Sequence, residues 1–137
     1  MADPTSAGLV GQPGEDPWTA TEIAEVRSDL TDQAERLRDE VARAESRLSG
    51  LMADAGDGAG HDQVDAGSAR MERDEEASLV EHSRDLLAQT ESALARIVAG
   101  SYGICEGCAG PVGKMRLMAF PRATRCLSCK RAEESQR

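Results

Sequence analysis

The chain has 137 residues, enough for one modest domain, yet it carries only three aromatic side chains. Charged residues make up 30% of it, and Ala, Leu and Val supply most of the apolar content, which favours long amphipathic helices over a conventional globular core. No stretch approaches the roughly 18 apolar residues of a membrane span, and the acidic N-terminus lacks the basic start of a signal peptide. We therefore expect a cytoplasmic protein that does not enter a membrane.

A first helix is predicted to begin near Thr19. Thr19 and Glu22 have the spacing of a capping box, and Trp18 and Ile23 have the spacing of a hydrophobic staple. Beyond this start, apolar residues recur every seven positions and predict a coiled-coil seam. The seam comprises Ile23, Leu30, Leu37, Ala44 and Leu51, with Val26, Val41 and Leu48 beside them. The helix should run to Met52, which is about 50 Å at roughly 1.5 Å per residue.

A second helix is predicted after a break in which residues 54–60 contain three glycines. Asp62 can act as its N-cap, with Asp65 in the first turn. The helix should run to Ala99, with Gly100 as its C-terminal stop. Its seam comprises Val80, Leu87 and Leu94, with Ala77, Ala93 and Ile97 nearby. Two helices of similar length joined by a short loop predict an antiparallel hairpin.

The four cysteines have the spacing C-x2-C-x17-C-x2-C, and they are Cys105, Cys108, Cys126 and Cys129. Four thiolates would complete a closed tetrahedral shell around one structural Zn²⁺, with no open position for a reacting water. Without an export signal, metal ligands are favoured over disulfides, although a thiol–disulfide pair or an iron site would also use such cysteines. No His/Glu set for a catalytic zinc, nucleophile–base pair or phosphate loop stands out, so we expect the protein not to be an enzyme.

The predicted fold is mainly α: a long antiparallel two-helix coiled-coil hairpin, followed by a small C-terminal zinc finger with four cysteine ligands and a short terminal helix. We expect residues 1–17 to form a flexible tail, 18–99 the hairpin with its tip near 53–65, and 100–137 the zinc-finger domain. The heptad core of the hairpin is expected to be separate from the finger.

Charge is divided unevenly along the chain, whose net charge is −9. Residues 1–99 carry 9 basic and 22 acidic side chains, whereas residues 100–137 carry 7 basic and 3 acidic ones. The acidic part should repel nucleic acid, while the basic end can meet phosphate or an acidic protein face. The candidate partner contacts, which would otherwise keep the finger soluble and positioned, are Arg116, Arg122, Arg125 and Lys130.

Two motifs resemble those of the DksA/TraR family. Around the cysteines, residues 96–108 read RI-x2-G-x-YG-x-CE-x-C, and residues 116–130 read RL-x-A-x-P-x-A-x2-C-x2-CK. In the hairpin, the stretch from Asp62 to Asp65 resembles the D-x-x-D tip of that family, and Asp65 precedes Cys105 by 40 residues, as in the family. The resemblance covers roughly residues 20–137.

In that family the hairpin enters the secondary channel of RNA polymerase, and the tip acids act near the catalytic magnesium and alter initiation complexes. The resemblance therefore implies a transcription regulator that binds core RNA polymerase or holoenzyme, with Asp62 and Asp65 facing the polymerase active site. We expect it to act as a monomer. We also expect no sequence-specific DNA binding, because the hairpin is acidic.

The chain departs from the family at several positions. Gly67 stands where the family tip usually has Ala. Family members that respond to ppGpp use basic residues on the second helix and near the finger. The matching positions here are His82, Gln89, Phe120 and Lys130, of which only Lys130 is basic, so a ppGpp response is not expected.

Two other functions stay open. The cysteine spacing also occurs in GATA-like DNA-binding zinc fingers, but the net charge and the acids Glu133 and Glu134 after Cys129 argue against DNA. A coiled-coil adaptor with a structural zinc knob would be favoured by an exposed hydrophobic stripe on the hairpin. In that interpretation Asp62 and Asp65 are only a helix cap and a first-turn acid.

Overall fold

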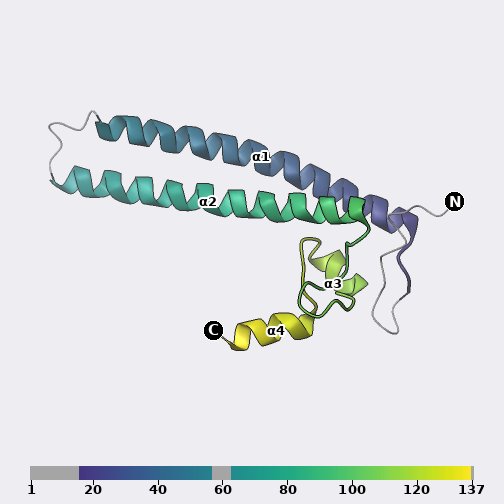
Figure 1. Cartoon of the computed structure of the whole chain (residues 1–137). Coiled ribbons are helices and arrows are strands. Elements are labelled where there is room, and N and C mark those ends of the chain that lie inside the picture. The colour runs from purple at the N-terminus through teal and green to yellow at the C-terminus, as the bar shows by residue number, and fades with distance from the viewer. Residues whose placement is uncertain (1–15, 57–62, 137) are drawn as a thin grey trace. The chain divides into compact units, whose positions relative to one another are not determined.

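A computed structural model describes residues 16–56 and 63–136. These residues form four helices in the order α1 (Ala20–Gly56), α2 (Gln63–Ala99), α3 (Lys114–Ala119) and α4 (Leu127–Ser135) (Figure 1). Early residues of α1 pack against late residues of α2, as the antiparallel hairpin requires. The predicted mainly helical fold is therefore confirmed, with two long packed helices, a cysteine cluster and short helices after it. None of the described helices combines the length and apolar character that crossing a membrane requires.

The start of α1 has the predicted capping box. The Thr19 backbone N–H donates to Glu22 Oε1 (3.0 Å), and the Glu22 backbone N–H donates to Thr19 Oγ1 (3.1 Å). These bonds satisfy two of the N–H groups that a helix start leaves without intrahelical partners. Trp18 and Ile23 are both buried beside this cap, so the entry of the chain into α1 is fixed by both hydrogen bonds and packing.

The end of α2 is a Schellman motif built on Gly100. The Ser101 N–H donates to the Arg96 carbonyl oxygen (2.9 Å), and the Gly100 N–H donates to that of Ile97 (3.3 Å). Gly100 has φ 79°, a left-handed conformation that costs glycine little. The predicted stop is confirmed, and it turns the chain directly into the first cysteine loop.

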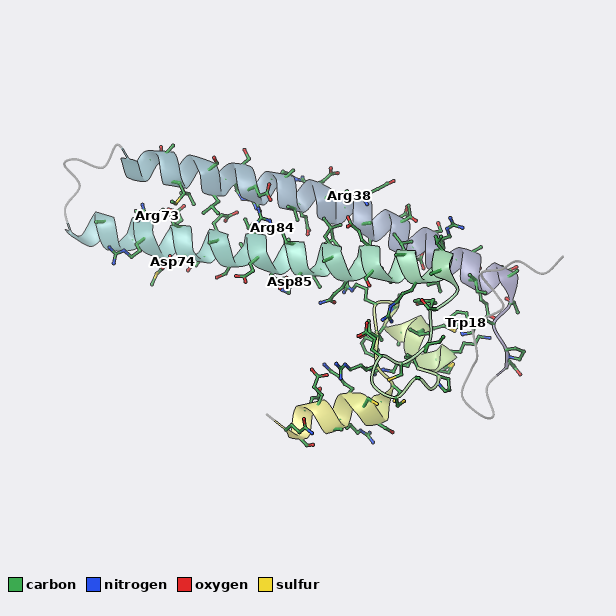
Figure 2. The ribbon with its side chains drawn as sticks, in the orientation of Figure 1. Trp18, Arg38, Arg73, Asp74, Arg84 and Asp85 are labelled. Carbon is green, nitrogen blue, oxygen red and sulfur yellow. The ribbon has the colours of Figure 1, made fainter. Side chains whose placement is uncertain are left out.

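The chain divides into two compact units, which we call unit 1 (Met1–Gln33 with Gln89–Arg137) and unit 2 (Ala34–Ala88). In unit 2, the helices pack through small and branched residues such as Ala44 and Val80. Two ion pairs join them: Arg47 Nε lies 2.6 Å from Glu76 Oε1, and Arg84 Nη2 lies 2.5 Å from Glu45 Oε1 (Arg84 is labelled in Figure 2). Charged side chains thus flank a narrow apolar seam.

The predicted seam of α2 is wrong at one position and incomplete at another. Ala77 is exposed, and the partly buried position beside it is Glu76. Fully buried in the same helix is Thr90, a polar residue that the apolar pattern passed over. Ala77 is exposed because seam positions alternate between spacings of three and four residues. Counting back from Val80, the next seam position is four residues away, at Glu76.

Unit 1 has one hydrophobic core to which the hairpin and the finger both contribute. Its buried members are Trp18, Ile23, Val26, Leu30, Ala93, Ile97, Tyr102, Cys105, Val112, Leu117 and Cys126. The expectation that the heptad core is separate from the finger is therefore wrong in this unit, because two cysteines of the finger belong to the same core cluster as residues of α1 and α2. The division of the chain into three domains stays a prediction.

Leu30→Ala should lower the free energy of unfolding by about 2–5 kcal/mol, because it empties a fully buried site in the unit 1 core. Denaturant unfolding of the metal-loaded protein, followed by circular dichroism, measures the change. Leu79→Ala is the matched control, since Leu79 is 51% exposed. Equal losses for both variants would contradict the assigned core.

Candidate metal centre

The four cysteine side chains meet at one point in unit 1. All four Sγ atoms lie within 4.8 Å of one another, and Cys108 Sγ is 3.8 Å from Cys126 Sγ. A disulfide would need about 2.05 Å. Four sulfurs at about 2.3 Å from a tetrahedral zinc ion would instead stand about 3.8 Å apart. The geometry fits a metal ion and not a disulfide.

Local backbone structure brings each cysteine pair into place. The first pair lies on a tight turn in which the Ala109 N–H donates to the Cys105 carbonyl oxygen (2.9 Å), and Ala109 takes φ 62° to close it. The second pair belongs to α4, with Cys126 as the N-cap and Cys129 in the first turn. The partial positive charge at a helix N-terminus favours thiolates there, so the second pair lies where anionic sulfur is stabilised.

Backbone donors surround the most buried sulfur. The N–H groups of Gly107 and Cys126 both donate to Cys105 Sγ, each at 3.3 Å. Burial alone raises the pKa of the Cys105 thiol, but backbone hydrogen bonds from Cys126, Cys108 and Gly107 lower it to about 6. Cys105 is thus prepared to act as a thiolate.

Cys129 has the opposite tendency. Hydrogen bonds with the sulfurs of Cys126, Cys105 and Cys108 raise the pKa of its thiol to about 12. Four sulfurs so close together resist full deprotonation, and a divalent cation removes that resistance when it replaces the protons. The donor set therefore fits Zn²⁺, which would be held by Cys105, Cys108, Cys126 and Cys129 in a closed, structural site.

The four candidate partner contacts of the finger line one groove in unit 1, of about 1030 Å³. Arg116 is committed inside the fold, because its Nε donates to the Arg125 carbonyl oxygen (3.0 Å) and its guanidinium lies 5.7 Å from the centre of the Phe120 ring. Arg125 itself pairs with Glu133 (3.5 Å). Arg122 and Lys130 line the same groove. Gln89 and Phe120 also line it, whereas His82 lies in unit 2.

Of the two candidate tip acids, the structure describes one. Asp62 is outside the described residues, and Asp65 belongs to the first turn of α2. Sequence reasoning missed Lys114, whose Nζ lies 2.7 Å from Glu22 Oε1, and the ion pair between Arg96 and Glu106. Neither pair has a local sequence signal. Lys114 and Glu22 come together only in the folded chain, and Arg96 and Glu106 lie ten residues apart across a turn.

The fold and the site define a zinc-finger protein in which a four-cysteine cluster is built onto a long helical hairpin. A family model described as the prokaryotic dksA/traR C4-type zinc finger matches residues 100–135. The chain is 32% identical to the RNA polymerase-binding transcription factor DksA of Escherichia coli K12 over 127 residues, which cover 90% of this chain and 78% of the relative. The chain belongs to the DksA/TraR family.

Other relatives agree with this assignment. Over 73 residues the chain is 34% identical to the RNA polymerase-binding transcription factor DksA of Caulobacter vibrioides, covering 53% of this chain and 51% of that one. The structure of the transcription factor DksA2 from Pseudomonas aeruginosa superposes with a TM-score of 0.69 at 26% identity, covering 85% and 86% of the two chains. The predicted zinc finger is confirmed, and the family is one of transcription factors rather than enzymes, as the sequence indicated.

Gly107→Ala should weaken zinc binding about 10- to 100-fold, the range seen when groups around metal ligands are disturbed. A Cβ at position 107 would lie 2.9 Å from Cys129 Sγ and 3.2 Å from Cys129 Cβ, so the ligand must shift. Competition with a chromogenic chelator measures the affinity, and Cys105→Ser serves as the reference for a lost ligand. The matched control is Gly110→Ala, whose Cβ would meet Cys108 Sγ at an ordinary 3.4 Å. Indistinguishable affinities for the two alanine variants would contradict the close packing around Cys129.

Proposed function

We propose that this chain binds RNA polymerase and regulates transcription initiation through the secondary channel of the enzyme. The observation that carries the proposal is the 32% identity to the RNA polymerase-binding transcription factor of Escherichia coli, which extends over 90% of the chain and so takes in hairpin and finger together. A likeness confined to the finger would support only a shared zinc site. The partner is core polymerase or holoenzyme, and the chain acts as a monomer.

The distribution of charge supports a protein partner over DNA. Residues 1–99 have 13 more acidic than basic side chains and would be repelled by phosphates, whereas residues 100–137 have four more basic than acidic ones. The basic surplus includes Arg122 and Lys130, two side chains of the finger groove. These two cations would meet an acidic face of the polymerase, and they would speed association more than they strengthen it.

The tip supplies the regulatory effect in this proposal. Asp62 and Asp65 would reach toward the catalytic magnesium, where carboxylates alter the local electrostatics without forming a covalent bond. Docking would come from the sides of the hairpin and from the finger. Binding and regulation are then separable, because they depend on different residues. No response to ppGpp is proposed, since Gln89 and Phe120 are uncharged.

A coiled-coil adaptor is the second candidate, and one observation favours it. Met71 and Leu79 are 65% and 51% exposed on α2, and they line a shallow depression of about 880 Å³ together with Gly67 and His82. Arg70, Asp74 and Glu75 also line the depression, and two exposed apolar side chains within a charged border can receive another helix. An adaptor would use this depression and would not need the tip acids.

The zinc-loaded protein should bind purified core RNA polymerase and should not bind duplex promoter DNA at physiological salt. Co-elution from a gel-filtration column with polymerase, and mobility shift with DNA, measure the two interactions. Arg122→Gln with Lys130→Gln should weaken the polymerase complex and reduce its salt dependence, because two interface cations are removed.

The matched control for that variant is Arg27→Gln with Arg36→Gln, which removes two exposed cations from α1. Equal weakening by both double variants would assign the effect to net charge and overturn the finger contact. A salt-sensitive DNA complex that survives unrelated competitor DNA would instead favour the GATA-like function.

Asp62→Asn with Asp65→Asn should leave polymerase binding intact and abolish the effect on initiation. The change removes two charges at nearly constant volume, and Asn is also a good N-cap, so the helix start should lose at most about 1 kcal/mol from the missing first-turn acid. In vitro transcription from a sensitive promoter, beside a binding assay, measures both properties. Asp29→Asn with Asp32→Asn has the same spacing on the exposed face of α1 and should regulate normally. Full regulation by the tip variant would favour the adaptor.

A further inference from the structure

The metal cluster of the finger is packed into the base of the hairpin. Cys105 and Cys126 are members of the unit 1 core, and Cys129 packs against it. The same core contains Trp18 and Leu30 of the α1 end. A change at the sulfurs can therefore reach side chains that are distant in sequence but belong to the same packed core.

Lys114 makes the polar part of this connection. It is the first residue of α3, and its side chain is only 12% exposed. Its Nζ lies 2.7 Å from Glu22 Oε1, 5.9 Å from the centre of the Trp18 ring, and 3.5 Å from the Pro17 carbonyl oxygen, to which it donates. One ammonium thus holds three features of the α1 start.

Glu22 has two tasks at once. Its carboxylate accepts the Thr19 N–H of the capping box and also receives Lys114 from the finger. The pKa of Glu22 is lowered from its ordinary value, mainly by the hydrogen bond from the Lys114 ammonium and next by the hydrogen bonds with Thr19. The carboxylate that accepts a hydrogen bond at the start of α1 is therefore paired with a cation of the finger, Lys114.

Aromatic packing makes the apolar part of the connection between the finger and the start of α1. The Trp18 and Tyr102 rings meet edge to face with centroids 6.3 Å apart, and the Tyr102 hydroxyl donates to the Pro121 carbonyl oxygen (2.9 Å). The Trp18 indole N–H is buried with no hydrogen-bond partner among the described residues. Packing and the Lys114 contact, rather than a hydrogen bond, therefore hold Trp18, which Figure 2 labels at the start of α1.

We propose that Lys114 and Trp18 are positioning residues that couple the metal content of the finger to the order of the α1 start. With zinc bound, the sulfurs fix the core, Lys114 meets Glu22, and residues 18–30 are held. When zinc is removed, the sulfurs separate, Lys114 loses its position, and the α1 start loosens while unit 2 keeps its own packing. This inference does not depend on polymerase binding.

Hydrogen exchange of the full chain, with zinc and after chelation, tests the coupling. In the wild type, chelation should speed exchange in residues 20–30 about tenfold, within the range typical of coupled sites, and should leave residues 40–80 nearly unchanged. Trp18 is the only tryptophan, so its emission should move to longer wavelength in the same titration. An unchanged Trp18 spectrum and unchanged exchange in residues 20–30 would overturn the proposal.

Lys114→Met separates coupling from simple support. It should speed exchange of residues 20–30 even with zinc bound, reduce the chelation effect to less than about threefold, and lower zinc affinity through linkage, although one zinc per chain still binds. Lys114→Arg should restore the wild-type ratio between the exchange rates of residues 20–30 after chelation and with zinc bound. Arg27→Met, which removes an exposed cation from the same helix as Glu22, should behave as wild type.

A merely structural role for Lys114 gives a different result. Exchange in residues 20–30 would then rise equally with and without zinc, and zinc affinity would not change, which would overturn the coupling. Glu22→Gln keeps the capping hydrogen bonds but removes the charge. Combined with Lys114→Met, it should add little beyond either single variant, and full additivity would contradict the assigned ion pair.

Discussion

The convergence of four sulfurs within 4.8 Å is the constraint on which unit 1 depends. A finger confined to residues 100–137, with two aromatic rings, cannot bury enough apolar surface to fold by packing alone. A metal ion closes its loops, and the cysteines then serve as core residues for the ends of α1 and α2. The two helix ends, in turn, cover the apolar side of Cys105 and Cys126. Ligation and hydrophobic burial are therefore parts of a single folding event in this unit.

Unit 2 is stabilised in another way. Its seam contains small residues such as Ala44, and its flanks carry ion pairs such as Arg84 with Glu45. Because these pairs are substantially exposed, each contributes little in salt, and the seam depends on the continuity of the two helices. The two units therefore differ in what holds them: a metal site and a shared core in unit 1, and a narrow seam with exposed ion pairs in unit 2.

The sequence predicted the parts of the fold that depend on local chemistry. The Thr19–Glu22 capping box, the stop at Gly100 and the cysteine pairs all act over a few residues, so their patterns can be read directly. Contacts between distant segments could not be read in that way. The pairing of Lys114 with Glu22 and the shared core arise only once the metal loops lie on the helices. The errors within the helices have a related cause: alanine at position 77 is compatible with either face of a helix, and the hydroxyl of Thr90 is ordinarily a surface group. For the candidate site, the four sulfurs follow from spacing, whereas the tip acids rest on family resemblance.

The heptad spacing of the two helices also limits how the hairpin can change in evolution. Seven residues make almost two full turns, whereas a single inserted residue rotates everything after it by about 100°. Loss or gain of one heptad in α1 is tolerated only when α2 loses or gains one opposite it, as the cross-helix pairs of Arg47 with Glu76 and Glu45 with Arg84 require. Hairpins on this scaffold should therefore differ in length by matched seven-residue steps, and the metal-bearing unit can remain unaltered while they do.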